Sequence, residues 1–248
     1  MSFTGFPAET FEFLRELSAH NDSGWFNQHW GEYERYYRDA AIDFVAALGP
    51  LLQELAPGLW YEPKVNGSVF RINRDIRFSR DKTPYKNHID LWFPFGDRKG
   101  WDKPGFFFRM FAGELTLGAG MHSFNEAQLA AFREAVSDPV RGGEVSRIIA
   151  EMAQAGYPVG PFGKELKRPP KGYEAPPERA WMLLQSGILG MHQEPVPQAA
   201  HSPEFVDYCL ERYTALWPLN RWLLDVLPIA APPPQIASAC PPASGSSQ

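Results

Sequence analysis

The hydrophobic residues at the start of the chain recur every three to four positions, which is typical of helices. This spacing predicts a first helix after Pro7 that ends where residues 21–24 interrupt the pattern. The same spacing resumes at residue 25 and continues to residue 55, which predicts a second, longer helix. Because Pro50 lies inside that stretch, we expect it to kink the second helix or to divide it in two.

The period then changes to two, the spacing of a half-buried strand. Between residues 68 and 78 apolar and polar side chains alternate, with Arg74 as a break in the apolar face. Further strands are expected at residues 89–93, 105–111 and 114–121. The last two are joined by Ala112 and Gly113, and so short a link predicts a hairpin and antiparallel pairing.

The second half of the chain returns to helical spacing. Asn125 is the expected N-cap of a helix through Val136, and further helices are expected at residues 140–155, 178–184 and 203–227. Residues 157–177 are rich in Gly and Pro and are expected to form a loop. Strand-helix alternation is absent, so the sequence predicts a single α+β domain with a central, mainly antiparallel sheet and helices packed on it.

Composition sets the limits of that domain. A chain of 248 residues with 44% hydrophobic and 21% charged residues has enough apolar side chains for one packed core. The predicted domain covers residues 1–227, because residues 228–248 carry no charge and are rich in Pro, Ala and Ser. Those last residues are expected to be a disordered tail.

Several classes of function have no support in the sequence. Two cysteines are too few for a disulfide framework or a thiolate zinc site, and the six histidines show no ligand spacing, so neither a metal nor another cofactor is expected. No leader and no apolar run of membrane-spanning length occurs, so we expect no membrane partner. Together with the few cysteines, this predicts a cytoplasmic protein.

The net charge of -5 is unevenly distributed along the chain. Residues 1–63 carry three basic side chains against ten acidic ones, whereas residues 64–88 carry seven basic side chains against two acidic ones. A short basic window in an acidic protein fits a focused anion site better than a broad nucleic-acid surface.

The basic window contains a long motif. Residues 67–88 read GSVFRINRDIRFSRDKTPYKNH, and shorter motifs lie at Phe3 to Phe6, at Asn21 to Phe26, at Gly118 to Gly120 and at Leu166 to Tyr173. In these segments the chain resembles the uncharacterised bacterial family of conserved hypothetical proteins called DUF2461. The resemblance implies a single α+β domain over nearly the whole chain, and it implies no established activity, substrate or catalytic residue.

The motif itself suggests where a ligand would bind. On the predicted strand Arg71, Asn73, Asp75 and Arg77 share one face at intervals of about 7 Å, and the following loop returns towards them. Guanidinium and ammonium groups bind carboxylates and phosphates, and Tyr and His can transfer protons. The candidate ligand-binding residues are Arg71, Arg77, Ser79, Asp81, Lys82, Tyr85, Lys86 and His88.

Three functions remain open at this point. The first is binding of, or catalysis on, a small anionic ligand that carries a phosphate or a carboxylate. The second is nucleic-acid binding, with Trp92 and Trp101 as stacking residues. The third is a structural or partner-binding role in which the same residues form an internal web, with Arg74 and Asp75 as a structural ion pair. The sequence does not decide whether the protein is an enzyme.

Overall fold

The fold is built around one antiparallel sheet. The computed structural model describes residues 3–96 and 102–229. Its five strands follow the order β1-β2-β3-β5-β4, and every neighbouring pair is antiparallel. The strands are β1 (Ile89–Pro94), β2 (Gly105–Met110), β3 (Glu114–Met121), β4 (Val159–Glu165) and β5 (Gln185–Pro195). The predicted single α+β domain and the hairpin between β2 and β3 are confirmed.

Helices form the rest of the domain. The first part of the chain holds α1 (Ala8–Ala19), α2 (Ser23–Gln28), α3 (Trp30–Glu32), the π-helix η1 (Tyr33–Asp39) and α4 (Ala40–Leu55). The second part holds α5 (Glu126–Ser137), α6 (Pro139–Gln154), α7 (Pro177–Ala180), η2 (Trp181–Leu184), η3 (Gln198–His201) and α8 (Phe205–Val226). The predicted cap of α5 is confirmed, because Asn125 and Gln128 bond each other's backbone N–H groups in a capping box.

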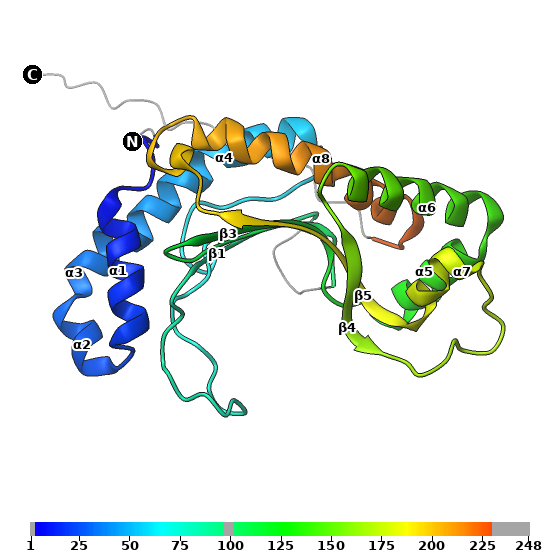
Figure 1. The fold of residues 1–248 in the computed structure, drawn as a ribbon, viewed down its shortest axis with the longest axis horizontal. Helices are drawn as coiled ribbons and strands as arrows, with labels where there is room; N and C mark the ends of the chain where they lie inside the picture. Colours follow the sequence, from blue (N-terminus) through cyan, green and yellow to red (C-terminus); the bar gives the residue numbers. More distant parts are fainter. Residues whose placement is uncertain (1–2, 97–101, 230–248) are drawn as a thin grey trace, which may run out of the picture.

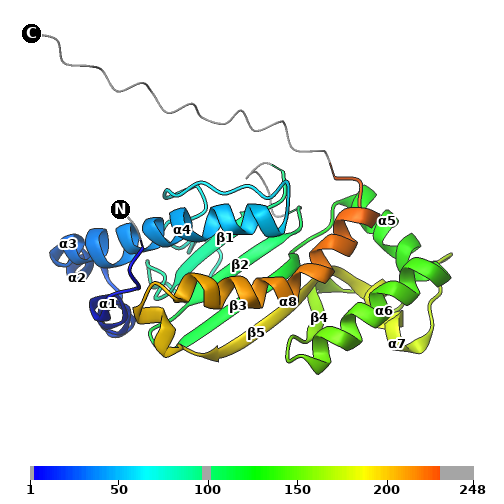
Figure 2. The same cartoon turned by 90° about the horizontal axis from the view of Figure 1, so that it is seen from above.

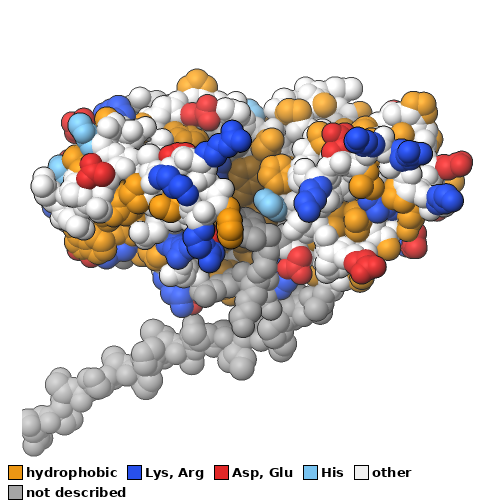
Figure 3. Space-filling model, turned by 90° about the horizontal axis from the view of Figure 1, so that it is seen from below, with side chains coloured by type: hydrophobic (Ala, Val, Ile, Leu, Met, Phe, Trp, Pro, Cys, Tyr) orange, Lys and Arg blue, Asp and Glu red, His pale blue; other side chains and the backbone are white. Residues whose placement is uncertain are grey.

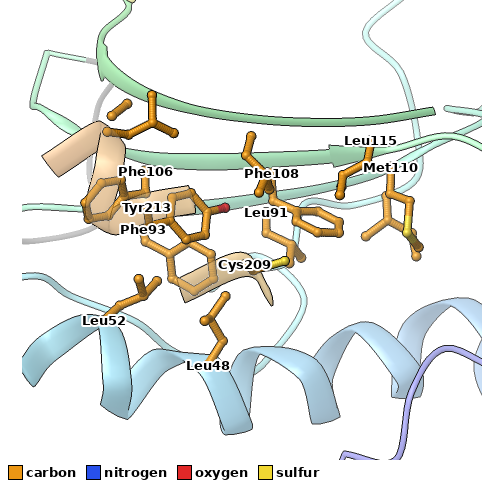
Figure 4. Close-up of a cluster of buried hydrophobic side chains, with 14 of the residues drawn as sticks. Leu48, Leu52, Leu91, Phe93, Phe106, Phe108, Met110, Leu115, Cys209 and Tyr213 are labelled. Carbon is orange, nitrogen blue, oxygen red and sulfur yellow. The ribbon is translucent and has the colours of Figure 1, made fainter. Parts of the chain in front are cut away.

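Among the described residues, no helix lies across one of the two faces of the sheet. Helices α4 and α8 lie across one face, while α1–α3 and α5–α7 lie at its two ends (Figures 1 and 2). Leu48 and Leu52 of α4 meet Phe93, Phe106 and Phe108 of the strands in the core between the layers (Figure 4). The opposite face is concave and is framed by the two ends of the molecule (Figure 1).

Pro50 does not divide the second helix. Helix α4 continues through Pro50 to Leu55, so the predicted division at this residue is wrong. The interruption lies earlier, where α2, α3 and the π-helical turn of η1 replace one regular helix between residues 23 and 39. A π-turn keeps the chain helical but shifts its register, which hydrophobic spacing alone does not predict.

The predicted strand at residues 68–78 is also wrong. Residues 68–74 run antiparallel to residues 84–92 and meet them only at isolated bridges, Val69 with Leu91 and Asn73 with Tyr85. Residues 75–83 form a loop that projects from the concave side (Figure 1). The alternation is misleading because, of the alternating apolar residues Phe70, Ile72, Ile76 and Phe78, only Ile72 is buried, so no continuous strand face exists.

Two strands were missed. Strand β4 lies in the stretch predicted to be a loop, and β5 follows it without having been predicted. Both contain glycine, and β4 also contains Pro161, which normally indicate turns. Strand β4 is an edge strand of the sheet, which explains why Pro161 is tolerated there. The disordered tail remains a prediction, since residues 230–248 lie outside the described residues.

Candidate functional site

A row of polar side chains crosses the concave face of the sheet. Strand register places Asp90 opposite Arg109, Arg109 opposite Thr116, and Thr116 opposite Gln193. Neighbouring residues such as Phe108 point to the other face and pack beneath the helices (Figure 4). Since side chains alternate along a strand, the polar row faces the concave side.

Asp90 is the centre of this row. Its carboxylate accepts hydrogen bonds from Nε of Arg109 at 2.7 Å and from Nη2 of Arg109 at 3.2 Å. Nζ of Lys86 lies 3.1 Å away, and Nε2 of His88 lies 3.2 Å away. We call Lys86, His88, Asp90 and Arg109 the Asp90 cluster.

The cluster carries more positive than negative charge. Lys86 and Arg109 outnumber the single carboxylate, and His88 adds a further positive charge whenever it is protonated. Burial by itself raises the pKa of Asp90, but hydrogen bonds from His88 and Arg109 and the charges of His88 and Lys86 outweigh it. The pKa of Asp90 is therefore well below its usual range, and the carboxylate stays ionised at neutral pH.

Exposure differs sharply within the cluster. The Asp90 side chain is only 12% exposed, whereas the Arg109 side chain is 46% exposed. Arg109 uses Nε and Nη2 to bind Asp90, and its Nη1 has no acceptor among the described residues. Asp90 thus holds the guanidinium in place from below, and the outer edge of the guanidinium is accessible to a ligand.

The surrounding elements fix the positions of Lys86 and His88. The backbone N–H of Lys86 donates to the carbonyl of Ile72, and its ammonium lies 4.6 Å from the centre of the Phe70 ring. The carbonyl of His88 accepts a hydrogen bond of 2.8 Å from the buried Tyr37 hydroxyl. These contacts tie the end of the basic motif to the sheet and to η1.

An apolar floor adjoins the cluster. Two residues further along the strands, register places Phe107 opposite Gly118 and Gly118 opposite Met191. A Cβ atom at Gly118 would lie 2.0 Å from the Phe107 ring, so this glycine is needed for close packing. Met191 is 39% exposed. Figure 3 shows hydrophobic side chains in the hollow of this face, with Lys and Arg side chains beside them.

The projecting loop has its own ion pairs. Arg77 binds Asp75 through two hydrogen bonds of 2.9 and 2.7 Å, and both side chains are exposed. Arg74 binds Asp81 at 2.5 Å and also contacts Thr83. The predicted pairing of Arg74 with Asp75 is therefore wrong: each binds a different partner, because the loop turns back on itself after Asp75.

The structure separates the eight candidate ligand-binding residues. Only Lys86 and His88 lie in the Asp90 cluster. Tyr85 is buried and stacks on Phe26 with ring centres 4.0 Å apart. Arg71 is exposed beside the projecting loop, and Arg77, Ser79, Asp81 and Lys82 belong to that loop. The predicted face shared by Arg71, Asn73, Asp75 and Arg77 does not form, because residues 68–78 are not a strand.

Sequence reasoning missed Asp90 and Arg109. A signal for both was present, since each is a single charged residue within an otherwise apolar strand. A charge in such a strand needs a partner, and register supplies it directly across the sheet.

The nucleic-acid hypothesis loses one of its two stacking residues, because Trp92 is almost fully buried. Trp101, the other one, lies outside the described residues.

Other classes of site have no support in the described parts of the chain. Residues 3–96 and 102–229 contain no group of three or more His, Cys, Asp or Glu side chains that could hold a metal ion. None of the helices described in those ranges has the length and apolar character needed to span a membrane.

The comparisons with known proteins identify a family and nothing more specific. No curated protein matches the chain. The family model of a conserved hypothetical protein (DUF2461) matches residues 9–222, which include the whole sheet, the projecting loop and the Asp90 cluster. Since that match covers most of the chain, the protein belongs to the DUF2461 family.

Proposed function

We propose that the protein binds a small anionic ligand, carrying a phosphate or a carboxylate, at the Asp90 cluster. The observation that carries the proposal is that one ionised carboxylate holds three basic side chains, one of them half-exposed on a concave face. In this arrangement Asp90 orients Arg109, and the excess positive charge attracts the ligand. A guanidinium fixed on one side is preorganised to bind an oxyanion on the other.

The apolar floor beside the Asp90 cluster indicates what the rest of the ligand, attached to the anionic group, should be like. Phe107 and Met191 lie about 7 Å further along the sheet, the distance between a phosphate and the far side of an attached ring or short chain. An apolar group on the anion would then cover the exposed part of Met191. We therefore expect phenyl phosphate to bind more tightly than inorganic phosphate.

A screen tests this function. Thermal unfolding of the wild type is followed with inorganic phosphate, pyrophosphate, citrate, benzoate and phenyl phosphate, and in parallel with Arg109→Gln. A ligand at 100 times its Kd stabilises the folded state by about 2.7 kcal/mol, which is readily detected. The proposal predicts stabilisation of the wild type that Arg109→Gln reduces by about half or more. It is contradicted if no anion stabilises the wild type, or if Arg109→Gln responds equally.

Nucleic acid is the second arm of the same test. Fluorescence anisotropy with single-stranded and duplex oligonucleotides at physiological salt tests nucleic-acid binding, because non-specific binding to a nucleic acid weakens steeply with salt. Tight binding that persists there would replace the small-anion proposal.

We also propose a cytoplasmic location, which is supported by the buried free thiol of Cys209. Fractionation of the native host's cells tests it.

A further inference from the structure

The side chain of Phe78 is exposed to solvent at the end of the projecting loop. Its exposed fraction is 94%, the highest among the large hydrophobic residues that the structure describes. The loop of residues 75–83 extends away from the sheet (Figure 1). A single exposed apolar residue is ordinary on a protein surface. An aromatic side chain at the end of a projecting and braced loop requires another explanation.

Hydrogen bonds and an ion pair stabilise the conformation of the loop. Arg74 binds Asp81 and contacts Thr83, and Nζ of Lys82 donates to the carbonyl of Ile76 at 2.8 Å. Beside the aromatic ring, the guanidinium carbon of Arg77 lies 5.9 Å from the ring centre of Phe78. An aromatic residue and an arginine on a preorganised loop are the usual anchors of a protein interface.

The loop is also positively charged. Residues 75–83 contain three basic side chains and two carboxylates, and the carboxylates are already bound to Arg77 and to the adjoining Arg74. Arg80 and Lys82 are exposed at its end. The surface that Phe78 fits should therefore combine an apolar hollow with negative charge.

The same chain carries such a hollow near its N-terminus. A cavity of about 660 Å³ lies between the start of α1 and the residues of η1 and α4. Its apolar lining includes Phe3, Pro7 and Ile42, and its carboxylates are Glu9, Asp39 and Asp43, against one basic residue, Arg35. Asp39 is bound by Arg38 at 2.8 Å, whereas Glu9 and Asp43 have no ion-pair partner among the described residues.

The loop and the hollow cannot meet within one molecule. The loop projects below the sheet, whereas the hollow is lined by residues at the start of α1 and in η1 and α4. Figure 1 shows the start of α1 beside the N-terminus, away from the loop. We propose that Phe78 of one copy docks into the N-terminal hollow of a second copy, with Arg80 and Lys82 facing Glu9 and Asp43. Because the two surfaces differ, this contact is head-to-tail and builds a chain or a closed ring.

Sedimentation of the full-length protein over a range of concentrations tests the proposal. The wild type should self-associate, more strongly at low salt. Phe78→Ser should weaken association roughly ten- to a hundredfold, the change expected for one exposed aromatic anchor. Asp43→Arg should weaken it by a similar factor, because it places a positive charge opposite Arg80 and Lys82. Val140→Ser and Glu144→Arg are the matched controls, because both residues are exposed on α6, away from the loop and the hollow. They should associate as the wild type does.

Mixing the two variants is the decisive step. Phe78→Ser keeps its hollow and Asp43→Arg keeps its loop, so an equimolar mixture should form pairs and nothing larger. The proposal is overturned if the wild type is still monomeric at about 1 mM, if the controls lose association as strongly, or if the mixture does not pair. Phe78-dependent binding to vesicles of an anionic phospholipid, by a chain that stays monomeric, would also overturn it.

Discussion

Replacing Asp90 by Asn tests whether the Asp90 cluster is held together as the structure indicates. The substitution preserves the shape of the side chain and removes the one charge that balances Lys86, His88 and Arg109. Removing one partner of a buried ion pair lowers the free energy of unfolding by about 3–5 kcal/mol. Because Arg109 is 46% exposed and water screens part of its charge, we expect a smaller loss of about 2–4 kcal/mol.

The loss should depend on pH, and its sign follows from the lowered pKa of Asp90. A carboxyl group with a lowered pKa in the folded state stabilises the protein above its unfolded pKa of about 3.9. That stabilisation decreases as the pH falls from there towards the folded pKa. The difference between wild type and Asp90→Asn should therefore shrink by about 1 kcal/mol between pH 7 and pH 3.

Urea unfolding at both pH values measures these differences, followed by the circular dichroism of the helices. The account of the cluster is refuted if Asp90→Asn unfolds at the same urea concentration as the wild type at pH 7. It is also refuted if the loss is the same at pH 3 as at pH 7, because the effect would then not come from the charge of Asp90.

Three further predictions concern Tyr85, the apolar floor and the projecting loop. Tyr85→Ala should lower the free energy of unfolding by about 3–5 kcal/mol, because it empties a buried aromatic site; a shift of under about 1 kcal/mol in urea unfolding would contradict its structural role. Gly118→Ala should destabilise by about 1–3 kcal/mol by displacing the Phe107 ring, and a Phe107→Leu background should relieve that loss in a double-mutant cycle. In the projecting loop, the hydrogen bonds from Arg77 lower the pKa of Asp75 to about 2. Arg77→Ala should return that pKa towards about 3.9, as read from carboxyl NMR titration, and an unchanged midpoint would show that the pair does not form.

The sequence predicted the parts of the fold that depend on local spacing. The helices at α1, α5, α6 and α8 and the hairpin of β2 and β3 follow from hydrophobic period, caps and a short link. Strand β4 and the segment at residues 68–74 could not be assigned in this way. Their conformation depends on which other segment of the chain lies beside them, and the hydrophobic pattern within one segment does not contain that information.

The same limit applies to the site. The basic motif led directly to Lys86 and His88, because they lie two positions apart within it. Asp90 and Arg109 join them only through the register of β1 and β2, which places residues 19 positions apart side by side. The charge count over residues 64–88 included Arg74 and Arg77, which are bound by Asp81 and Asp75 in and beside the projecting loop.

The most direct test of anion binding compares three proteins in one calorimetric titration. Phenyl phosphate is titrated into the wild type, into Arg109→Gln and into Arg77→Gln, which removes an exposed arginine of the projecting loop. If the Asp90 cluster binds the anion, Arg109→Gln should raise Kd at least about tenfold, the loss of one charge-assisted hydrogen bond, and Arg77→Gln should leave Kd unchanged. An unchanged Kd for Arg109→Gln, or an equal loss in Arg77→Gln, would contradict the assignment of the site to the Asp90 cluster.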